Sequence, residues 1–335
     1  MEIAKTMRPI VVVGSINMDL VSAAPRIPVA GETLLGSNFQ MHSGGKGANQ
    51  AVAVARLGYP AEMIGMVGSD LFGVQLRLNL QRAGVGVDGV AIMEGPTGTA
   101  AITVASSGEN CIVVTPGANA AMSPEYVEQH RSLIRKAGMV LTQLEIPIES
   151  VERLAEICAE TDVPLMLDPA PAQALSPSLL KRIRWFTPNE TEAEFYANPG
   201  MEQQNTEGHG VGGSDATGLG ETARSVLARG PVGIILKLGS RGAYLVSDAD
   251  GIAQQVTAPP VDVVDTTAAG DALNGAFAVA MMLGKTPLES VQFAVAAASI
   301  SVTRSGAQPS MPTMAEVSRL LEDKQPFDPT SLEIA

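Results

Sequence analysis

Short apolar runs rich in β-branched residues alternate with helical patterns along this chain of 335 residues. Between most of these runs, apolar residues recur at helical spacing, as in Ala48, Ala51, Val52 and Ala55. Strands joined by helices pair in parallel, with helices on both faces, so the alternation predicts an α/β fold with a central, mostly parallel sheet. The expected strands occupy residues 10–13, 61–67, 139–144, 163–167, 183–186, 233–238 and 243–246.

Two kinds of segment interrupt this alternation. Residues 21–39 and 97–115 have extended character without an obvious crossover helix, and we expect them to pair as a small accessory sheet. Residues 198–220 are rich in Gly, Asn, Gln and Asp and lack a hydrophobic period, which predicts a flexible surface insertion. The length of the chain allows either one large domain or two smaller ones.

Composition disfavours several classes of function. A formal net charge of −13 argues against nucleic acid or an anionic membrane as the main partner. Cys111 and Cys158 lack metal-type spacing, and the three histidines are scattered, which disfavours zinc chemistry. The N-terminus has no apolar core of a signal peptide, and the apolar runs are too short to span a bilayer, so we expect a cytoplasmic protein.

One polar motif stands where a helix is expected to begin. Residues 261–264 are expected to be extended, and residues 265–271 then place small residues between Asp265 and Asp271, directly before a helical pattern. A helix start presents free backbone N–H groups and binds anions, and a carboxylate beside it suits a general base for phosphoryl transfer to a hydroxyl. The alternative is that Asp271 is an ordinary early-turn acid favoured by the helix dipole.

Further polar residues follow the expected strands at their carboxyl ends, where ligands bind in open parallel sheets. Asn17 and Asp19 follow the first strand and are two residues apart, so both should point to one side of an extended segment. The other such positions are Glu145, then Asn189, Glu190 and Glu192, and finally the segment 239–242.

A glycine pair opens the helix expected after residue 45. Gly44 and Gly45 would let a ligand approach the backbone, while Lys46 and Asn49 offer donors one turn apart. Beside Asn17 and Asp19, this segment suits a pocket for vicinal hydroxyls, although the glycines alone would indicate only a turn. A GxGxxG match at residues 84–89 follows a helical pattern and precedes residues 90–93, which we expect to be extended. This order indicates a helix C-cap rather than a dinucleotide site.

Four segments in order resemble the signatures of ribokinase-type members of the PfkB carbohydrate kinases, and the resemblance runs from about residue 10 to 312. The segments are 14–19, 44–50, 187–192 and 265–271. The resemblance implies one ribokinase-like, three-layer α/β/α kinase domain. It also implies a β-sheet lid, built from residues of about 18–40 and 97–116, that closes over the sugar and often forms a homodimer contact.

The resemblance also implies roles for individual residues. Asp271 would be the general base, and the backbone of Ala268, Ala269 and Gly270 would form the anion hole. The residues implied to contact the sugar are Asn17, Asp19, Gly44, Gly45, Lys46, Asn49, Glu145 and Asp271.

Nucleotide and metal positions follow in the same way. The residues implied near ATP are Asn189, Glu192, Lys237, Gly239, Ser240, Gly242 and Gly270, with Glu192 acting on Mg²⁺ through water. A K⁺ ion beside the anion hole would be held by Asp265, Thr267, Ser301, Arg304, Gly306 and Ser310. Lys237 and Val295 depart from the family pattern, in which Thr, and Asn or His, are common, and these departures concern the nucleotide contacts.

The leading hypothesis is therefore ATP-dependent phosphorylation of D-ribose at its 5-hydroxyl. The nearest alternative is the same reaction on another sugar or on a nucleoside, such as fructose, 2-keto-3-deoxygluconate or a ribonucleoside. A non-catalytic binding protein is disfavoured because a binder needs no base at Asp271, and a dinucleotide-dependent oxidoreductase is disfavoured by the misplaced GxGxxG match.

Overall fold

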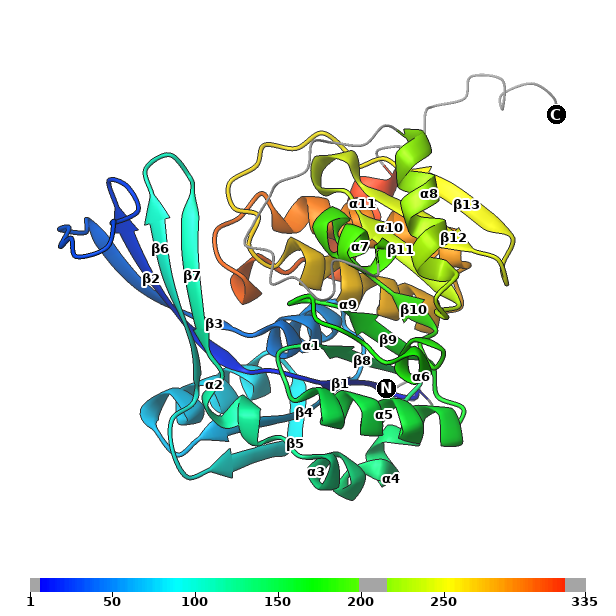
Figure 1. Ribbon diagram of the computed structural model, residues 1–335, viewed down its shortest axis with the longest axis horizontal. Helices are drawn as coiled ribbons and strands as arrows, with labels where there is room; N and C mark the ends of the chain where they lie inside the picture. Colours follow the sequence, from blue (N-terminus) through cyan, green and yellow to red (C-terminus); the bar gives the residue numbers. More distant parts are fainter. Residues whose placement is uncertain (1–6, 199–215, 323–335) are drawn as a thin grey trace.

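A large sheet forms the centre of the computed structural model, which describes residues 7–198 and 216–322 (Figure 1). Its strand order is β13-β12-β11-β10-β9-β8-β1-β4-β5. Pairing is parallel from β5 to β11 and antiparallel at β12 and β13. The strands are β1 (Ile10–Val13), β4 (Ala61–Gly68), β5 (Val85–Met93), β8 (Met139–Gln143), β9 (Leu165–Asp168), β10 (Trp185–Phe186), β11 (Gly233–Lys237), β12 (Ala243–Ser247) and β13 (Ile252–Val256).

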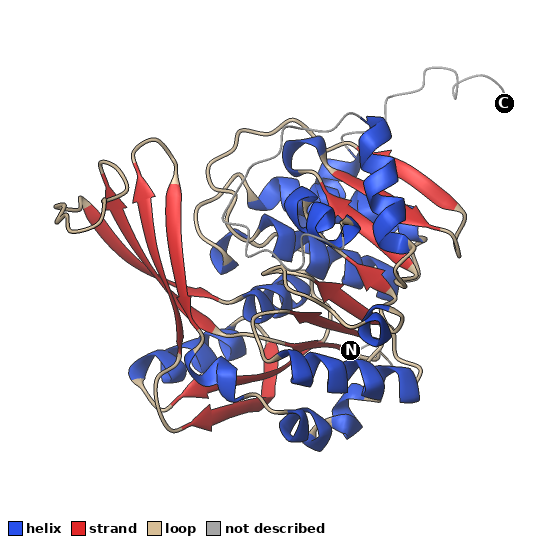
Figure 2. Ribbon diagram, in the orientation of Figure 1, coloured by secondary structure: helices blue, strands red, loops and turns tan. Residues whose placement is uncertain are grey.

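Helices cover both faces of this sheet, which confirms the α/β/α prediction (Figure 2). One face packs on α1 (Lys46–Arg56), α2 (Leu71–Arg82), α9 (Ala269–Met282), α10 (Pro287–Ser301) and α11 (Met314–Glu322). The other face packs on α3 (Pro124–Gln129), α4 (Arg131–Ile134), α5 (Ile148–Glu160), α6 (Pro177–Leu180), α7 (Glu190–Ala197) and α8 (Ala216–Leu227).

Small residues bring α1 and α9 unusually close together. Gly275 of α9 lies so near α1 that an added Cβ would stand 2.6 Å from the Cβ of Ala53. Phe277, further along α9, packs edge-to-face on Trp185 of β10, with ring centroids 5.1 Å apart. These contacts fix the amino ends of both helices beside the carboxyl ends of the central strands.

A second sheet of four strands extends from the main body (Figure 1). Its order is β3-β2-β6-β7, formed by β2 (Asn17–Ala24), β3 (Asn38–Gly44), β6 (Gly98–Ala105) and β7 (Asn110–Thr115). The two irregular segments therefore do pair, since β2 and β6 run parallel with Asn17 opposite Gly98. Only three residues separate β1 from β2, so the small sheet begins at the edge of the large one.

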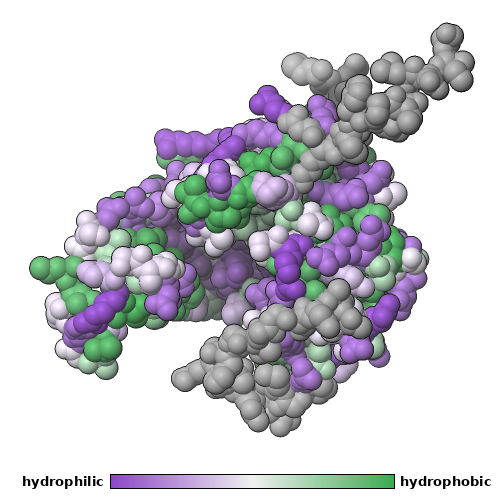
Figure 3. All heavy atoms as spheres, turned by 90° about the horizontal axis from the view of Figure 1, so that it is seen from above, coloured by the Kyte–Doolittle hydropathy of each residue, from purple (hydrophilic) through white to green (hydrophobic). Residues whose placement is uncertain are grey.

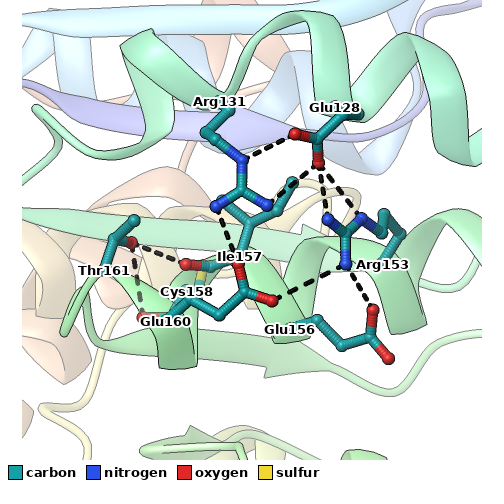
Figure 4. Close-up of polar contacts among 8 residues, drawn as sticks. All are labelled: Glu128, Arg131, Arg153, Glu156, Ile157, Cys158, Glu160 and Thr161. Atoms are coloured by element: carbon teal, nitrogen blue, oxygen red, sulfur yellow. Dashed lines mark hydrogen bonds and ion pairs between the residues drawn. The ribbon is translucent and has the colours of Figure 1, made fainter.

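Ion pairs tie α3 and α4 to α5 on the surface (Figure 4). The Glu128 carboxylate accepts hydrogen bonds from Arg131 at 2.6 Å and from Arg153 at 2.7 Å. The two guanidinium groups lower the pKa of Glu128 to about 2. Exposed pairs of this kind stabilise a fold only weakly, so they orient these helices rather than hold the core.

Several predicted boundaries were wrong. Helix α8 begins at Ala216, so residues 216–220 of the predicted insertion are helical, whereas 199–215 lie outside the described residues. Residues 261–264, predicted to be extended, form no strand. The C-cap at Gly84 is confirmed by its positive φ of 88°, but β5 starts at Val85, five residues earlier than expected. Strand β13 was missed because its central residues are exposed.

Candidate active site

A cavity of about 700 Å³ opens at the carboxyl ends of the central strands. Figure 3 shows a hollow with hydrophilic residues at its floor, between the small sheet and the main body. The location agrees with the ligand position expected for an open parallel sheet. Residues named from the sequence that line the cavity are Lys46, Asn189, Glu192, Lys237, Gly239, Ser240, Gly242, Ala268, Ala269, Gly270 and Asp271.

The start of α9 forms one wall of this cavity. Ala268 precedes the helix in the left-handed conformation, with φ of 60°, and makes no side-chain cap. The N–H groups of Gly270 and Asp271 lie in the first turn, where helix geometry provides no intrahelical acceptor. This turn is therefore suited to an anion, as the sequence predicted.

Asp271 is held inside the protein rather than at the surface. Its carboxylate accepts hydrogen bonds from the side-chain amides of Asn49 and Gln50, each at 3.0 Å. Burial raises the pKa of Asp271 to about 6, with Lys46 opposing the rise and Asp168 adding to it. An ordinary acid favouring the helix dipole needs neither burial nor two amide donors, so the geometry favours a chemical role.

The residues assigned to the sugar converge from β2, β3 and α1. The Asp19 carboxylate lies against Gly44, where an added Cβ would stand 2.1 Å from Oδ2. The backbone N–H of Lys46 donates to Glu145 Oε2 at 3.1 Å, and Asn17 Oδ1 accepts from Asn119 Nδ2 at 2.7 Å. These residues therefore lie in one neighbourhood, next to Asp271.

Charge is concentrated at this end of the site. Burial, together with the nearby carboxylates of Glu145 and Asp271, raises the pKa of Asp19 to about 7. Partial burial lowers the pKa of the half-buried Lys46 ammonium group, but the several carboxylates that it faces raise it, and their effect is the larger. Lys46 is therefore the local counter-ion of an acidic pocket.

The residues assigned to ATP surround the other end of the cavity. Asn189 caps α7, and the carboxylate of Glu192 accepts from the backbone N–H of Asn189 at 2.8 Å and from its side-chain amide at 3.0 Å. Lys237 ends β11, and its Nζ lies 2.8 Å from Asp168 Oδ1. Gly242 follows with φ of 91°, and an added Cβ would stand 2.0 Å from the Val256 carbonyl oxygen.

Asp265 organises a separate loop cluster behind α9. Its Oδ1 accepts from Thr267 N at 2.9 Å and Thr267 Oγ1 at 2.6 Å, and its Oδ2 accepts from Gly306 N at 2.8 Å. These bonds lower the pKa of Asp265 against the opposing effect of burial.

The other residues assigned to a cation have different side-chain partners. The hydroxyls of Ser301 and Ser310 donate to the carbonyls of Ala298 and Ala307, and Arg304 pairs with Glu316. In the ranges that the structure describes, no three His, Cys, Asp or Glu side chains come close enough together to hold a metal ion. One carboxylate with carbonyl and hydroxyl oxygens nearby is a hard, weakly charged donor set, which fits a monovalent cation better than a divalent one.

Three polar residues of the site were not assigned from the sequence. Asp168 ends strand β9, so the rule that identified Glu145 could have found it. Gln50 closes the segment 44–50 and was given no role, although it contacts Asp271. Asn119 lies in the 3₁₀ helix Gly117–Ala121, and no local pattern marks it.

Among the described residues, no helix combines the length and the apolar character needed to cross a membrane.

Comparisons with known proteins agree with this geometry. The model of the "pfkB family carbohydrate kinase" matches residues 7–314. A ribokinase from Bacillus subtilis is 41% identical over 94% of this chain and 100% of its own length, and one from Haemophilus influenzae is 39% identical over 94% and 99%.

A solved structure of Arabidopsis thaliana ribokinase in complex with ribose and ATP superposes with a TM-score of 0.84 at 35% identity. The superposition covers 95% of this chain and 99% of that protein. Because the family model and these relatives span nearly the whole sequence, the chain belongs to the pfkB family of carbohydrate kinases.

Proposed function

We propose that this protein transfers the γ-phosphoryl group of ATP to the 5-hydroxyl of D-ribose, forming D-ribose 5-phosphate and ADP. The observation that carries the proposal is the buried Asp271 carboxylate at the start of α9. It lies between the residues assigned to the sugar and the cavity of about 700 Å³. The ribokinase relatives support ribose as the sugar and ATP as the phosphoryl donor.

In the proposed reaction, Asp271 accepts the proton of the 5-hydroxyl as its oxygen bonds to the γ-phosphorus. The bond from that phosphorus to the β,γ-bridging oxygen breaks, and ADP leaves. The backbone at Ala268, Ala269 and Gly270 stabilises the charge on the transferring group, because the first turn of α9 is suited to an anion. Closure of the small sheet over the sugar would exclude water and limit hydrolysis of ATP.

Ribose would be held by the residues that converge on Asp271. Asp19 and Glu145 accept hydrogen bonds from vicinal hydroxyls, whereas Asn17, Lys46 and Asn49 donate to them. Gly44 and Gly45 let the end of β3 and the start of α1 pack against Asp19 and the backbone of residues 15–17, because an added Cβ at either position would collide with them. A site matched to hydroxyl groups discriminates strongly against analogues that lack them.

ATP would occupy the rest of the cavity. Asn189, Glu192 and Lys237 lie near the phosphates, and Gly239, Ser240 and Gly242 form the adjacent loop. Mg²⁺, when bound, would neutralise phosphate charge there, and the occupied carboxylate oxygens of Glu192 suit contact with the ion through water. Val295 and Val302 supply an apolar wall for the adenine ring of ATP.

A coupled assay of ADP release across a panel of sugars and nucleosides tests this assignment. D-Ribose should give the highest kcat/KM, with 2-deoxyribose, fructose, 2-keto-3-deoxygluconate and ribonucleosides below it. A clear preference for one of the other substrates would support the kinase activity but show that ribose is not the preferred acceptor. Absence of phosphorylation throughout the panel would overturn the proposal.

Acid should inhibit the reaction in a defined range. The base works only when deprotonated, and burial raises the pKa of Asp271 to about 6. We expect kcat/KM to be constant above pH 7.5 or so and to fall about tenfold per pH unit below pH 6. The profile is measured with coupling enzymes in excess at every pH, and an unchanged kcat/KM at pH 5 would contradict a base with this pKa.

We also propose that Asp265, Thr267, Ser301, Arg304, Gly306 and Ser310 provide a K⁺ site, largely through carbonyl oxygens. The hydrogen bonds from Thr267 and Gly306 to Asp265 draw this loop together behind the anion-binding turn. A cation there would fix the path of residues 265–268 and hence the start of α9.

Replacing K⁺ with Na⁺ or tetramethylammonium should therefore lower kcat, because the anion-binding turn is less well ordered. Initial rates are compared at constant ionic strength and constant Mg²⁺. The Asp265→Asn variant should lose most of the difference between cations. Equal rates of the unaltered protein in all three salts would discredit the site.

A homodimer through the small sheet is a further part of the proposal. Residues paired across this sheet share a face, and the register places Leu20, Met41, Ala101 and Val113 on the face opposite that of Asp19. Met41 and Val113 are exposed, as is Phe39 on the same face. An exposed apolar face on one side of a sheet is typical of an interface.

Val113→Asp should convert the dimer to a monomer in light scattering, because it places a charge on that face, on the edge strand β7. Val74→Asp is the matched control, since Val74 is equally exposed on α2 but belongs to the main body. A monomeric unaltered protein would refute the dimer.

A cytoplasmic location is proposed because ATP is the phosphoryl donor, and the free thiols Cys111 and Cys158 are compatible with a reducing compartment. With a net charge of −13, we expect neither nucleic acid nor an anionic membrane as a partner.

A further inference from the structure

A buried side-chain amide joins the proposed base to a second carboxylate. Gln50 of α1 is 1% exposed, and its Nε2 donates to Asp271 Oδ1 at 3.0 Å and to Asp168 Oδ2 at 3.1 Å. Its Oε1 accepts from Gln143 Nε2 at 2.7 Å. The bond from Gln143 fixes the orientation of the Gln50 amide, because the reversed amide would turn its oxygen toward two carboxylates.

Asp168 is in turn fixed from the nucleotide side of the cavity. Its Oδ1 pairs with Lys237 Nζ at 2.8 Å, and the Asp168 side chain is 2% exposed. The Lys237 ammonium group also lies beside the first turn of α9, since a Cβ added to Gly270 would stand 3.4 Å from Nζ. A continuous chain of polar contacts therefore runs from Lys237 at the end of β11 through Asp168 and Gln50 to Asp271.

We propose that Gln50 and Asp168 are positioning residues for the reaction: Gln50 holds the Asp271 carboxylate in line with the acceptor hydroxyl, and Asp168 holds Gln50 while pairing with Lys237. This inference rests on the proposed role of Asp271 as the base. Asn49 alone would leave the carboxylate free to rotate about its single amide contact, whereas donors on both oxygens fix its plane.

The two residues act on the base with opposite electrostatic sign. The Gln50 amide stabilises the charged carboxylate and lowers the pKa of Asp271, whereas the negative charge of Asp168 raises it. The other charged groups around the base are Lys46 and Asp19, which are present in both variants described below. The charged groups facing Asp168 are Lys237, Lys46, Glu192 and Asp271.

Opposite displacements of the pH profile are the expected result. Gln50→Met keeps the side-chain volume and removes the donor, so the acid limb of kcat/KM should move up by about half to one pH unit. Asp168→Asn keeps the shape and an oxygen acceptor but removes the charge, so the limb should move down by about the same amount. Gln50→Met should also lower kcat by about 10- to 100-fold, with a smaller change in the KM for ribose.

Ser150→Ala is the matched control for loss of a buried hydrogen bond. The Ser150 hydroxyl is fully buried on α5 and donates to the Met122 carbonyl, on the opposite face of the sheet. This variant should lower the melting temperature and leave the pH profile in place. A structural effect of Gln50→Met or Asp168→Asn would likewise move stability without giving displacements of opposite sign.

Displacements in the same direction, or none, would overturn the inference. If Gln50→Met does not fold, Asp168→Asn alone decides, because an unchanged acid limb in that variant contradicts the role of Asp168. Asp271→Asn is measured alongside to separate the two proposals. An inactive Asp271→Asn with unchanged profiles in the other two variants refutes only the positioning role, whereas an active Asp271→Asn refutes the base itself.

Discussion

Replacing Asp271 with Asn should lower kcat at least about 100-fold, the low end of what general-base catalysis contributes. Asn has nearly the same shape and still accepts a hydrogen bond from one of the two amides that hold Asp271, but it does not take up the hydroxyl proton. The fold and the pocket should persist. The KM for ATP should change little, because the first turn of α9 binds the phosphoryl group through its backbone.

Single-turnover measurements with ribose and ATP, together with calorimetric titration of ribose, separate chemistry from binding. The expected pattern is a slow chemical step with ribose affinity within a few-fold of the unaltered protein. Turnover within a few-fold of the unaltered protein would remove Asp271 from its proposed role. Lost ribose binding with unchanged single-turnover chemistry at saturation would instead make Asp271 a binding residue.

Replacing Gly45 with Ala should raise the KM for ribose by at least about tenfold, because a displacement near 1 Å misaligns the pocket. Gly45 has φ of 86°, and an added Cβ would stand 2.7 Å from Asn17 N and 2.9 Å from both Ile16 Cα and Ser15 O. These are backbone atoms, so relief requires β2 and the start of α1 to separate. The midpoint of thermal unfolding should fall as well, because overpacking typically costs about 1–3 kcal/mol.

Gly58→Ala is the matched control for this substitution. Gly58 has φ of 78°, close to that of Gly45, but nothing lies within 4 Å of an added Cβ. The control therefore carries the strain of a positive φ without the collision, and its KM for ribose should not change. Equal effects of the two substitutions would show that backbone strain, rather than contact with β2, limits position 45.

The layered fold was predictable because it follows from patterns within short windows. Each buried parallel strand is an apolar run, such as residues 10–13, and each covering helix repeats its apolar residues every three or four positions. The exposed strand β13 escaped detection because its residues Ala253, Gln254 and Gln255 are in contact with solvent and carry no such pattern. Residues 261–264 are mostly valine yet irregular, since several residues between Ala258 and Val263 line a cavity rather than pair with a strand.

Much of the candidate site was also predictable, because polar residues at the carboxyl ends of parallel strands gather at one edge of the sheet. Lys46 and Asp271 were expected there, and both line the cavity. The contact between Asn119 and Asn17 was not predictable, since it joins positions 102 residues apart through a short 3₁₀ helix. The bond from Gln50 to Asp168 likewise depends on how α1 packs over β9, which no local pattern encodes.

The close contact between α1 and α9 has a consequence for how this site would evolve or be redesigned. Lys46 and Asn49 lie on one of these helices and Asp271 on the other, and Gly275 against Ala53 leaves no room for the helices to slide. The packing of α1 on α9 therefore fixes the distance between the donors of α1 and Asp271. A change of sugar preference has to come from the small sheet and its strand β2, because a larger residue at position 275 would move the proposed base away from every substrate alike.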